Sequence, residues 1–177
     1  MNKEISTIFI ETPRLIITPY SLVLVEEISK IYTDPQIIKY TLQNRPRTPK
    51  EIQAIIEKEV GLYKKFKRRG KWLVYNKLTQ ELMGYVGLLY IPQLYKYELS
   101  FAFIDKYRGN GYATEAATYL VNYAFKELKH KVLVAMVEKE NIKCQRVLTK
   151  LGFKYQHDIE LYGYVFELFK ITSPAVI

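Results

Sequence analysis

The sequence predicts a protein of the α/β class (α+β type), in which a mixed sheet of about seven strands is flanked by about four helices. The chain of 177 residues suits one domain that buries most of its apolar surface. Short runs typical of strands, such as 132–137, are interspersed with longer stretches of helical period. No internal repeat, low-complexity stretch or linker divides the chain, so we expect 1–177 to form a single domain.

The N-terminal half is predicted to contain a strand, two helices and a hairpin. The second helix has the clearest start, because Thr48, Pro49 and Glu51 form a capping box with proline at the first helical position. The first helix is expected to end near Asp34 and Pro35. In chain order, the expected elements are a strand over 11–18, helices over 23–32 and 48–69, and strands over 72–76 and 82–90 around a turn at 78–81.

The C-terminal half is predicted to alternate strands with helices. Apolar residues recur at helical spacing after Tyr112, which indicates a helix with one buried face. Asn141 is a candidate N-cap for the last helix, and Gly152 is a candidate C′ residue. In chain order, the expected elements are a strand over 97–104, a helix from 112 to about 129, a strand over 132–137, a helix over 141–152, and strands over 153–157 and 161–170.

The chain is basic, with a formal net charge of +9. Much of the excess lies in the run 64–71, at the end of the second predicted helix. Cations there complement the helix dipole, so we interpret the run as a solvated helix end. A basic balance also suits nucleic acid, an anionic membrane surface or a phosphate-rich ligand. Nothing beside the run resembles an RNA-stacking motif or a DNA recognition helix, and the 16 tyrosines are scattered.

Cysteine use and hydropathy bear on the compartment. The single cysteine, Cys144, excludes an internal disulfide framework and gives no reason to assign an oxidising compartment. No apolar segment suits a signal peptide, and no run approaches the ~18 apolar residues of a membrane-spanning helix. We therefore expect a cytoplasmic protein with no membrane partner.

The most informative segment is 108–116, a turn with two glycines between a predicted buried strand and the long helix. Its N–H groups and the positive end of the helix dipole point at one spot, which predicts an anion site. A dinucleotide fold would place glycine or alanine at Thr114, and a P-loop would place Lys-Ser or Lys-Thr after Gly111. Neither pattern is present. An anion site of another class and a purely structural turn both remain open.

A second segment, 141–153, follows one strand after the long helix and reads Asn-Ile-Lys-Cys-Gln-Arg-Val-Leu-Thr-Lys-Leu-Gly-Phe. Together the two segments resemble the GNAT acetyltransferase superfamily. Residues 108–113 match its acyl-CoA pyrophosphate motif, and 141–153 is similar to the Asn-x-x-Ser-x-x-x-Leu-x-Lys-x-Gly-Phe pattern of the ribosomal-protein N-acetyltransferase-like branch. Shorter matches lie at 11–15, 82–87 and 98–101, so the resemblance covers about residues 11–170.

The resemblance implies a mostly antiparallel sheet with two splayed central strands, and acetyl-CoA as the acetyl donor. The pyrophosphate would lie on the N–H groups of the turn, where glycines allow close approach. One splayed strand would pair with the pantetheine arm. The implied donor-binding residues are Phe101, Ala102, Phe103, Arg108, Gly109, Asn110, Gly111, Tyr112, Ala113, Thr114, Asn141 and Arg146, with Lys143 and Lys150 beside Arg146 near the 3′-phosphate. The alternatives are that Arg108 is a surface arginine, that the basic residues form a solvated face and that Asn141 is a plain helix cap.

The implied reaction is direct attack of a primary amine on the acetyl thioester in a ternary complex, with no metal. The amine must be neutral, and Glu98 is the candidate base because it matches a glutamate of the branch. The alternative is that Glu98 is a surface or core-edge glutamate in a salt bridge. An N–H near Phe101 would polarise the thioester carbonyl, an effect worth ~3 kcal/mol. Leu148 stands where many members carry a tyrosine acid. Cys144 replaces the serine of the branch, and it is either a residue near the coenzyme A sulfur or a small buried residue.

The acceptor is expected to be a protein N-terminus or a small amine, bound by about residues 20–48 and 155–165. Asp34, Asp158 and Glu160 are candidates to attract a cationic amine, and the basic helix end is a candidate to hold an acidic peptide or ribosomal RNA. Two alternatives from other classes remain. The first is an acyl-CoA-binding module without catalysis, and the second is a nucleic-acid-binding protein, for which only the net charge argues.

Overall fold

The computed structural model describes residues 9–66 and 69–174. The N-terminal residues 1–8, for which no signal peptide was expected, lie outside the described residues, and so do Lys67 and Arg68 of the basic run. The elements are β1 (Ile10–Glu11), β2 (Leu15–Pro19), η1 (Leu22–Leu24), α1 (Val25–Tyr32), α2 (Pro35–Ile38), α3 (Pro49–Phe66), β3 (Gly70–Asn76), β4 (Leu82–Ile91), η2 (Pro92–Leu94), β5 (Lys96–Phe103), η3 (Asp105–Tyr107), α4 (Tyr112–Lys126), β6 (Val132–Val137), α5 (Ile142–Lys150), β7 (Lys154–Leu161) and β8 (Tyr164–Thr172).

Across residues 9–66 and 69–174, eight strands form one sheet in the order β1-β2-β3-β4-β5-β6-β8-β7, in which only the β5–β6 pair is parallel. That pair is short, because β5 and β6 are matched only at Tyr97 with Leu133 and at Glu98 with Val134. Beyond Glu98, β5 stays paired with β4 as far as Phe103, while β6 stays paired with β8 as far as Val137. The two central strands therefore diverge, which confirms the expected splayed, mostly antiparallel sheet.

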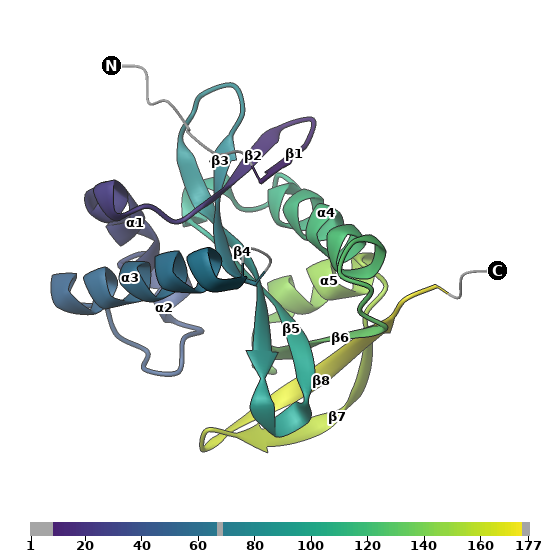
Figure 1. Ribbon diagram of the computed structural model, residues 1–177. Helices are drawn as coiled ribbons and strands as arrows, with labels where there is room; N and C mark the ends of the chain where they lie inside the picture. Colours follow the sequence, from purple (N-terminus) through teal and green to yellow (C-terminus); the bar gives the residue numbers. More distant parts are fainter. Residues whose placement is uncertain (1–8, 67–68, 175–177) are drawn as a thin grey trace.

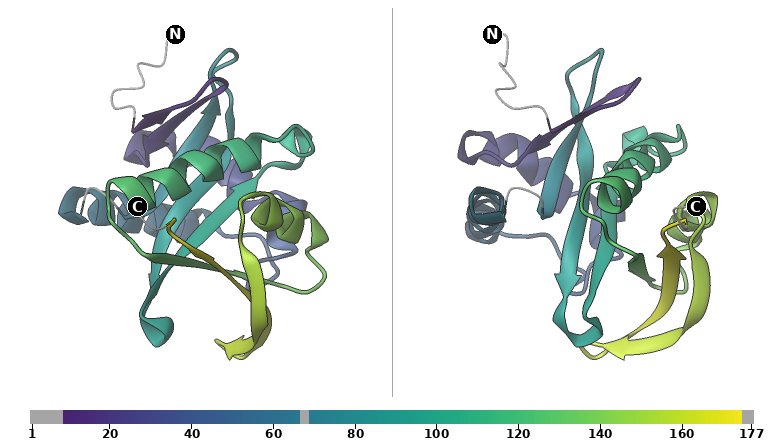
Figure 2. Two further views of the ribbon diagram at one scale, coloured as in Figure 1. Left: turned by 90° about the vertical axis from the view of Figure 1, so that its right-hand side faces the viewer. Right: turned by 45° about the vertical axis from the view of Figure 1, so that its right-hand side comes forward.

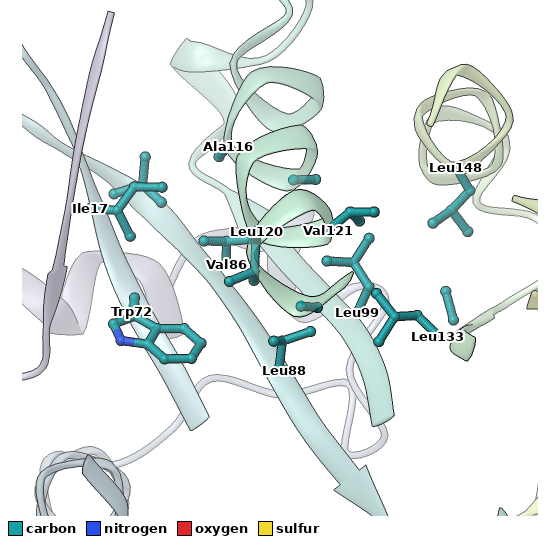
Figure 3. Close-up of a cluster of buried hydrophobic side chains, with 14 of the residues drawn as sticks. Ile17, Trp72, Val86, Leu88, Leu99, Ala116, Leu120, Val121, Leu133 and Leu148 are labelled. Atoms are coloured by element: carbon teal, nitrogen blue, oxygen red, sulfur yellow. The ribbon is translucent and has the colours of Figure 1, made fainter. Parts of the chain in front are cut away.

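Helices cover both faces of the sheet (Figures 1 and 2). On one face α4 packs over a core in which Trp72, Leu88 and Leu120 are fully buried (Figure 3). On the other face α1 and α3 cover a second core that includes Ile56 and Leu73. Burial of each such side chain stabilises the fold by about 1.5–3 kcal/mol. Trp72 and Leu73 point to opposite faces because side chains alternate along a strand.

The N-terminal strand differs from the prediction, and a short helix that was not predicted follows the first one. The strand expected over 11–18 is interrupted at Pro13, and its two parts pair with each other as β1 and β2, which adds an eighth strand. The short helix α2 follows α1 directly. Its N-cap is Asp34, whose Oδ1 accepts hydrogen bonds from the N–H groups of Gln36 and Ile37, while its Oδ2 accepts one from Asp105. Asp34 is buried in this structural role, so its proposed contact with an acceptor amine is wrong.

The capping box of α3 is confirmed, but the basic run is not one feature. The N–H of Thr48 donates to Glu51 Oε2 (2.8 Å), and the N–H of Glu51 donates to Thr48 Oγ1 (3.3 Å). Within the described residues α3 ends at Phe66, and Lys71 lies in strand β3. The side chains of Lys71 and Trp72 point to opposite faces of the sheet, because they are adjacent on the strand. Trp72 faces α4, so Lys71 lies on the face that α1 and α3 cover and not at a solvated helix end.

Candidate active site

A cavity of about 1020 Å³ runs from the glycine turn, past the splayed strands, to α2 and the segment after it. It brings together nearly all the residues predicted to form the site. Those that line it are Glu98, Phe101, Ala102, Phe103, Arg108, Gly109, Gly111, Tyr112, Ala113, Thr114, Asn141, Cys144 and Arg146, together with Lys143 and Lys150. Asn110 is not among the lining residues. Its carbonyl accepts a hydrogen bond from Arg14 Nη1 (3.0 Å), and its side-chain amide donates to the carbonyl of Arg108 (3.1 Å).

The glycine turn presents an open helix N-terminus to this cavity. Gly109 and Gly111 have φ values of 82° and 79°, in the left-handed region that favours glycine. Gly111 is the N-cap of α4, and within the described chain no side chain caps this end. The first N–H groups of α4 and the positive end of its dipole therefore remain directed at a ligand, as an anion site requires.

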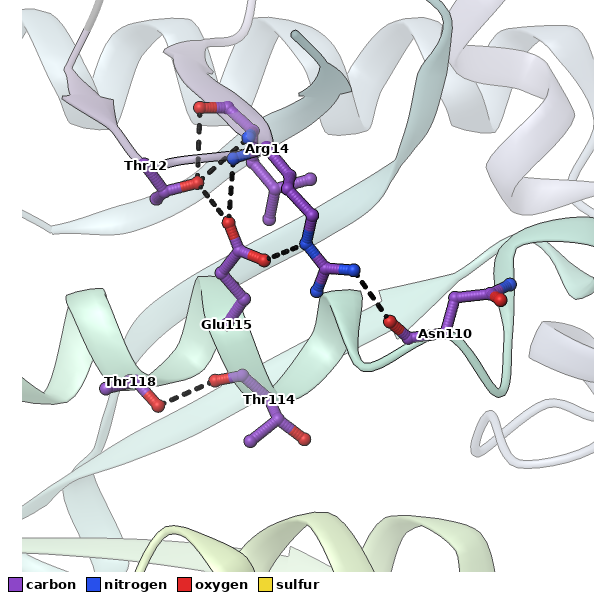
Figure 4. A network of polar contacts seen from close by, with 7 residues as sticks. Thr12, Arg14, Asn110, Thr114, Glu115 and Thr118 are labelled. Carbon is purple, nitrogen blue, oxygen red and sulfur yellow. Dashed lines mark hydrogen bonds and ion pairs between the residues drawn. The ribbon is translucent and has the colours of Figure 1, made fainter.

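A polar network that sequence reasoning missed holds the turn against the connection between β1 and β2 (Figure 4). Glu115 Oε1 accepts hydrogen bonds from Thr12 Oγ1 (2.6 Å) and the N–H of Arg14 (3.0 Å), and Glu115 Oε2 pairs with Arg14 Nε (2.5 Å). The Arg14 guanidinium also lies 4.5 Å from the centre of the Tyr112 ring. The segment 11–15 was matched to the family without a role, and the network supplies one: it positions the anion-binding turn.

Replacing Glu115 by glutamine is expected to lower the free energy of unfolding by about 1–3 kcal/mol, because it removes a mostly buried acceptor of charged hydrogen bonds. Burial alone raises the pKa of Glu115, but the hydrogen bonds from Thr12 and Arg14 outweigh it and lower this pKa. The stabilisation is therefore present above the ordinary glutamate pKa and lost as the pH falls through the lowered one. Urea unfolding at pH 7 and at acidic pH measures both effects.

Thr118→Val serves as the matched control for that experiment. Its exposed hydroxyl lies one helical turn further along α4 and donates only to the carbonyl of Thr114 (2.8 Å). We expect its effect on the free energy of unfolding to stay within about 0.5 kcal/mol. Equal stabilities of Glu115→Gln and wild type at pH 7 would show that the network does not hold the turn.

The backbone of β5 faces the splayed gap only at alternate residues. The N–H of Ile104 donates to Met83 on β4 (2.9 Å), and hydrogen-bonding direction alternates along an antiparallel strand. Ala102 therefore pairs with β4, whereas Phe101 and Phe103 face the gap. The carbonyl of Phe103 accepts a hydrogen bond from Arg108 Nε (2.8 Å). The expectation that backbone groups of all three residues pair with pantetheine is thus wrong for Ala102.

Glu98 lies where β5 and β6 begin to diverge. Burial raises the pKa of its carboxyl to about 7, although the N–H of Met136 and the nearby charge of Lys71 act in the opposite direction. A carboxyl that titrates near neutrality can accept a proton from a reacting group under cellular conditions. The geometry therefore places a candidate base within the same cavity as the anion site.

Asn141 and Cys144 lie at the start of α5. Asn141 Oδ1 accepts a hydrogen bond from the N–H of Cys144 (3.2 Å), so its role as helix N-cap is present. Burial, and then the neighbouring Glu98, raise the pKa of the Cys144 thiol to about 12. Cys144 therefore remains a thiol at neutral pH, which makes it a weak hydrogen-bond donor and not a nucleophile.

The half of the cavity away from the turn agrees in part with the expected acceptor region, because residues of both predicted ranges, 20–48 and 155–165, line it. Asp158 and Glu160 do not line it, and Asp158 instead accepts a hydrogen bond from Tyr155 (2.9 Å). The hydroxyl of Tyr164 donates to the carbonyl of Leu42, joining the β7–β8 hairpin to the segment after α2. Side chains from α2, α3, the sheet and the hairpin line this half: Gln36, Tyr40, Thr41, Lys58, Lys71, Tyr85, Leu89, Tyr162 and Phe166.

Comparison with known proteins bears on the class of this chain. The model of the "Acetyltransferase (GNAT) domain" matches residues 14–154. "Uncharacterized N-acetyltransferase YoaA" of Bacillus subtilis (strain 168) is 26% identical over 156 residues, which are 88% of each chain. A crystal structure of a GNAT-family acetyltransferase from Bacillus anthracis has a TM-score of 0.78 and 23% identity, covering 93% of this chain and 98% of that one.

A third comparison is with RimL, the ribosomal L7/L12 α-N-protein acetyltransferase in complex with coenzyme A. Its TM-score is 0.79 at 10% identity, covering 94% of this chain and 98% of the RimL chain, a likeness that shows the fold. The splayed sheet, the open turn and these matches define the protein as an acetyltransferase. The chain belongs to the GNAT acetyltransferase family. Within the described ranges, no helix combines the length and apolarity needed to cross a membrane.

Proposed function

We propose that the protein, as one acyltransferase domain, transfers an acetyl group from acetyl-CoA to a primary amine by direct attack in a ternary complex. The observation that carries this proposal is the position of Glu98, a buried carboxyl with a pKa of about 7, in the same cavity as the open N-terminus of α4. The first group suits removal of a proton from an amine, and the second suits binding of a pyrophosphate.

The donor half of the cavity provides suitable contacts for acetyl-CoA. The pyrophosphate lies on the N–H groups from Gly109 to Thr114, and the exposed Arg146, Lys143 and Lys150 meet the 3′-phosphate. The pantetheine arm lies in the gap between β5 and β6, beside the backbone of Phe101. The RimL complex, which holds coenzyme A, supports this class of donor.

The chain's own groups then carry the reaction. Glu98 takes a proton from the acceptor ammonium, directly or through water, so that the neutral amine attacks the thioester carbon. The N–H of Phe101 donates to the carbonyl oxygen as it gains negative charge. A carbon–nitrogen bond forms, the carbon–sulfur bond breaks, and the thiolate leaves close to Cys144, whose thiol donates a weak hydrogen bond. The nitrogen then loses its second proton, and because Leu148 offers none, this proton passes to the leaving thiolate, directly or through water.

A thiol-release assay with acetyl-CoA tests this function. We expect release of free coenzyme A that depends on an added amine, with N-terminal peptides, small amino compounds, polyamines and aminoglycosides as the acceptor panel. Isothermal titration of acetyl-CoA measures donor binding separately. Binding without turnover would instead identify an acyl-CoA-binding module, and the absence of both would contradict the proposal.

Other expectations rest on the sequence alone. A cytoplasmic location stays a prediction. Recognition of ribosomal RNA near a protein N-terminus also stays a prediction. Its basis is weaker than expected, because Lys71 lies on β3 and not with Lys64 and Lys65 on α3. If the protein binds no nucleic acid even at low salt, where phosphate contacts are strongest, the nucleic-acid alternative is excluded.

A further inference from the structure

The acceptor half of the cavity has a lysine at its base. Lys71 lies on β3, and its cross-strand neighbours are Gly87 on β4 and, one strand further, Ser100 on β5. A Cβ atom on Gly87 would lie only 3.1 Å from Lys71 Cγ, so the lysine stem runs across the sheet above this glycine. Since Lys71 and Ser100 both line the cavity, the stem extends into the space where an acceptor would lie.

Aromatic groups surround the Lys71 ammonium. Its Nζ lies 4.5 Å from the centre of the Tyr85 ring and 5.8 Å from that of Tyr32, distances typical of cation–π contact. Burial lowers the pKa of Lys71, but Tyr85, Tyr32 and Glu59 together raise it above its ordinary value. The ammonium is therefore charged at neutral pH. Glu59 Oε2 accepts a hydrogen bond from the backbone N–H of Lys71 (2.9 Å).

This charge has no salt bridge within the chain that the structure describes. The ion pairs found across residues 9–66 and 69–174 involve Arg14, Arg45, Lys77 and Lys106, but not Lys71. A partly desolvated ammonium without a salt-bridge partner is costly unless other groups supply negative charge, and here the nearby Glu59 supplies part of it. The aromatic rings offset only a further part of that cost. An anion that enters the cavity would complete the site.

The other charged groups of the cavity favour an anionic ligand in this half. Lys58 on α3 adds a second cation. Of the carboxylates that line the cavity, Asp105 and Glu138 follow the C-terminal ends of β5 and β6, away from the row of Lys71, Gly87 and Ser100. Glu98 alone is close, and it is the proposed base for the amine of the acceptor, so its charge faces the amine and not the anionic group. Such a site repels polycations and attracts negative charge.

We propose, resting on the acetyltransferase function above, that the acceptor is a primary amine that also carries an anionic group, a carboxylate or a phosphate, and that Lys71 binds this group. The amine then lies toward Glu98 and the anion toward Tyr85 and Lys58. Lys71 is on this account a determinant of acceptor specificity, because it distinguishes an amino acid or a phosphorylated amine from the same amine without its negative charge.

Matched acceptor pairs test the proposal by thiol release. One pair is tyrosine and tyramine, for a carboxylate, and the other is O-phosphoethanolamine and ethanolamine, for a phosphate; spermidine represents polycations. We expect kcat/KM to be about 10- to 100-fold higher for the anionic member of at least one pair, as a hydrogen bond to a charged group allows. Which pair shows the preference distinguishes the two sources of the anion.

Lys71→Met is expected to abolish that preference, lowering kcat/KM for the anionic member by the same factor and for the neutral member less than threefold. Lys71→Arg is expected to retain part of the preference, since it retains the charge. Lys50→Met, which removes an exposed lysine at the start of α3, is the matched control and should behave as wild type. Thermal melting of each variant shows that it is folded.

Two results would overturn the proposal. The first is an equal loss for both members of each pair in Lys71→Met, which would mean that Lys71 acts only on the protonation of Glu98. The second comes from titration of each anionic probe in the presence of coenzyme A. It is the result that neither probe binds wild type more tightly than it binds Lys71→Met. Neither result bears on donor binding or on acetyl transfer to other amines, so failure of the proposed function itself is read separately, from acetyl-CoA titration and the amine panel.

Discussion

Replacing Glu98 by glutamine is expected to lower kcat about 100- to 1000-fold while leaving acetyl-CoA binding nearly unchanged. Glutamine keeps the size and polarity of the side chain but cannot accept the proton of an ammonium, and a positioned base contributes factors of this order. The donor contacts proposed above lie mainly at the turn and at α5, which do not include Glu98. Steady-state thiol release and titration of acetyl-CoA measure the two effects.

The pH profile gives an independent readout of the same variant. In wild type kcat should rise with pH and level off above about 7, as the Glu98 carboxyl loses its proton, and Glu98→Gln should lack this step. Because the pKa of Glu98 is raised on folding, the folded state binds the proton more tightly, and stability falls as the pH rises from about 4.5 to 7. The glutamine variant should therefore be at least as stable as wild type at pH 8.

Glu127→Gln is the matched control, since Glu127 is exposed at the end of α4. It should leave kcat and the pH profile unchanged. Wild-type turnover by Glu98→Gln, with an unaltered pH profile, would show that another group removes the proton.

Replacing Gly84 by alanine is expected to lower the free energy of unfolding by about 3 kcal/mol or more. A Cβ atom at this position would lie 2.0 Å from the carbonyl oxygen of Ala102 and 2.9 Å from the Cα of Phe103, and neither backbone atom can move without breaking the β4–β5 ladder. Overpacking of this kind is destabilising even where flexible side chains can adjust. Urea unfolding of the purified variant measures the loss.

Gly61→Ala gives the contrasting control. Gly61 lies within α3, and a Cβ atom there would meet nothing within 4 Å. Alanine should stabilise the helix by about 0.5–1 kcal/mol, because glycine loses more conformational freedom on folding. If Gly84→Ala were as stable as Gly61→Ala, the close approach of β4 and β5 would not be required. That approach pairs Ala102 with β4 and so leaves Phe101 facing the gap.

Prediction from sequence succeeded where the signal was local. Strand β6 was predicted with its observed ends, and α4 with its observed start at Tyr112. The capping box of Thr48 and Glu51 and the N-cap at Asn141 were also confirmed. Hydrophobic period and capping involve residues within a few positions of each other, so these elements carry their own signals. Asp34 shows the limit, since it was a candidate to attract an amine, whereas its carboxylate caps α2 and accepts a hydrogen bond from the N–H of Asp105.

The residues of the candidate site also divide into those with a local sequence signal and those without one. The turn at 108–114 and the segment from Asn141 could be predicted because each is a continuous run that forms its own backbone geometry. The link from Arg14 to Glu115 joins residues that are 101 positions apart in the chain, so no local pattern indicates it. Lys71 was placed at a helix end by the charge of its neighbours. Alternation with Trp72 could have indicated its face, but not the cavity that it enters.

The sequence by itself determined most of the elements, the glycine turn and the family resemblance, because period, capping and glycine placement act over a few neighbouring residues. Only the tertiary structure decided which groups meet across the splayed sheet. The pairing of β4 with β5 sets which backbone groups of β5 face the gap, and burial between β5, β6 and α5 sets the pKa of Glu98. The passage of the Lys71 stem over Gly87 depends on three strands in register. Such contacts arise from distant segments, and their energies exist only once those segments are packed together.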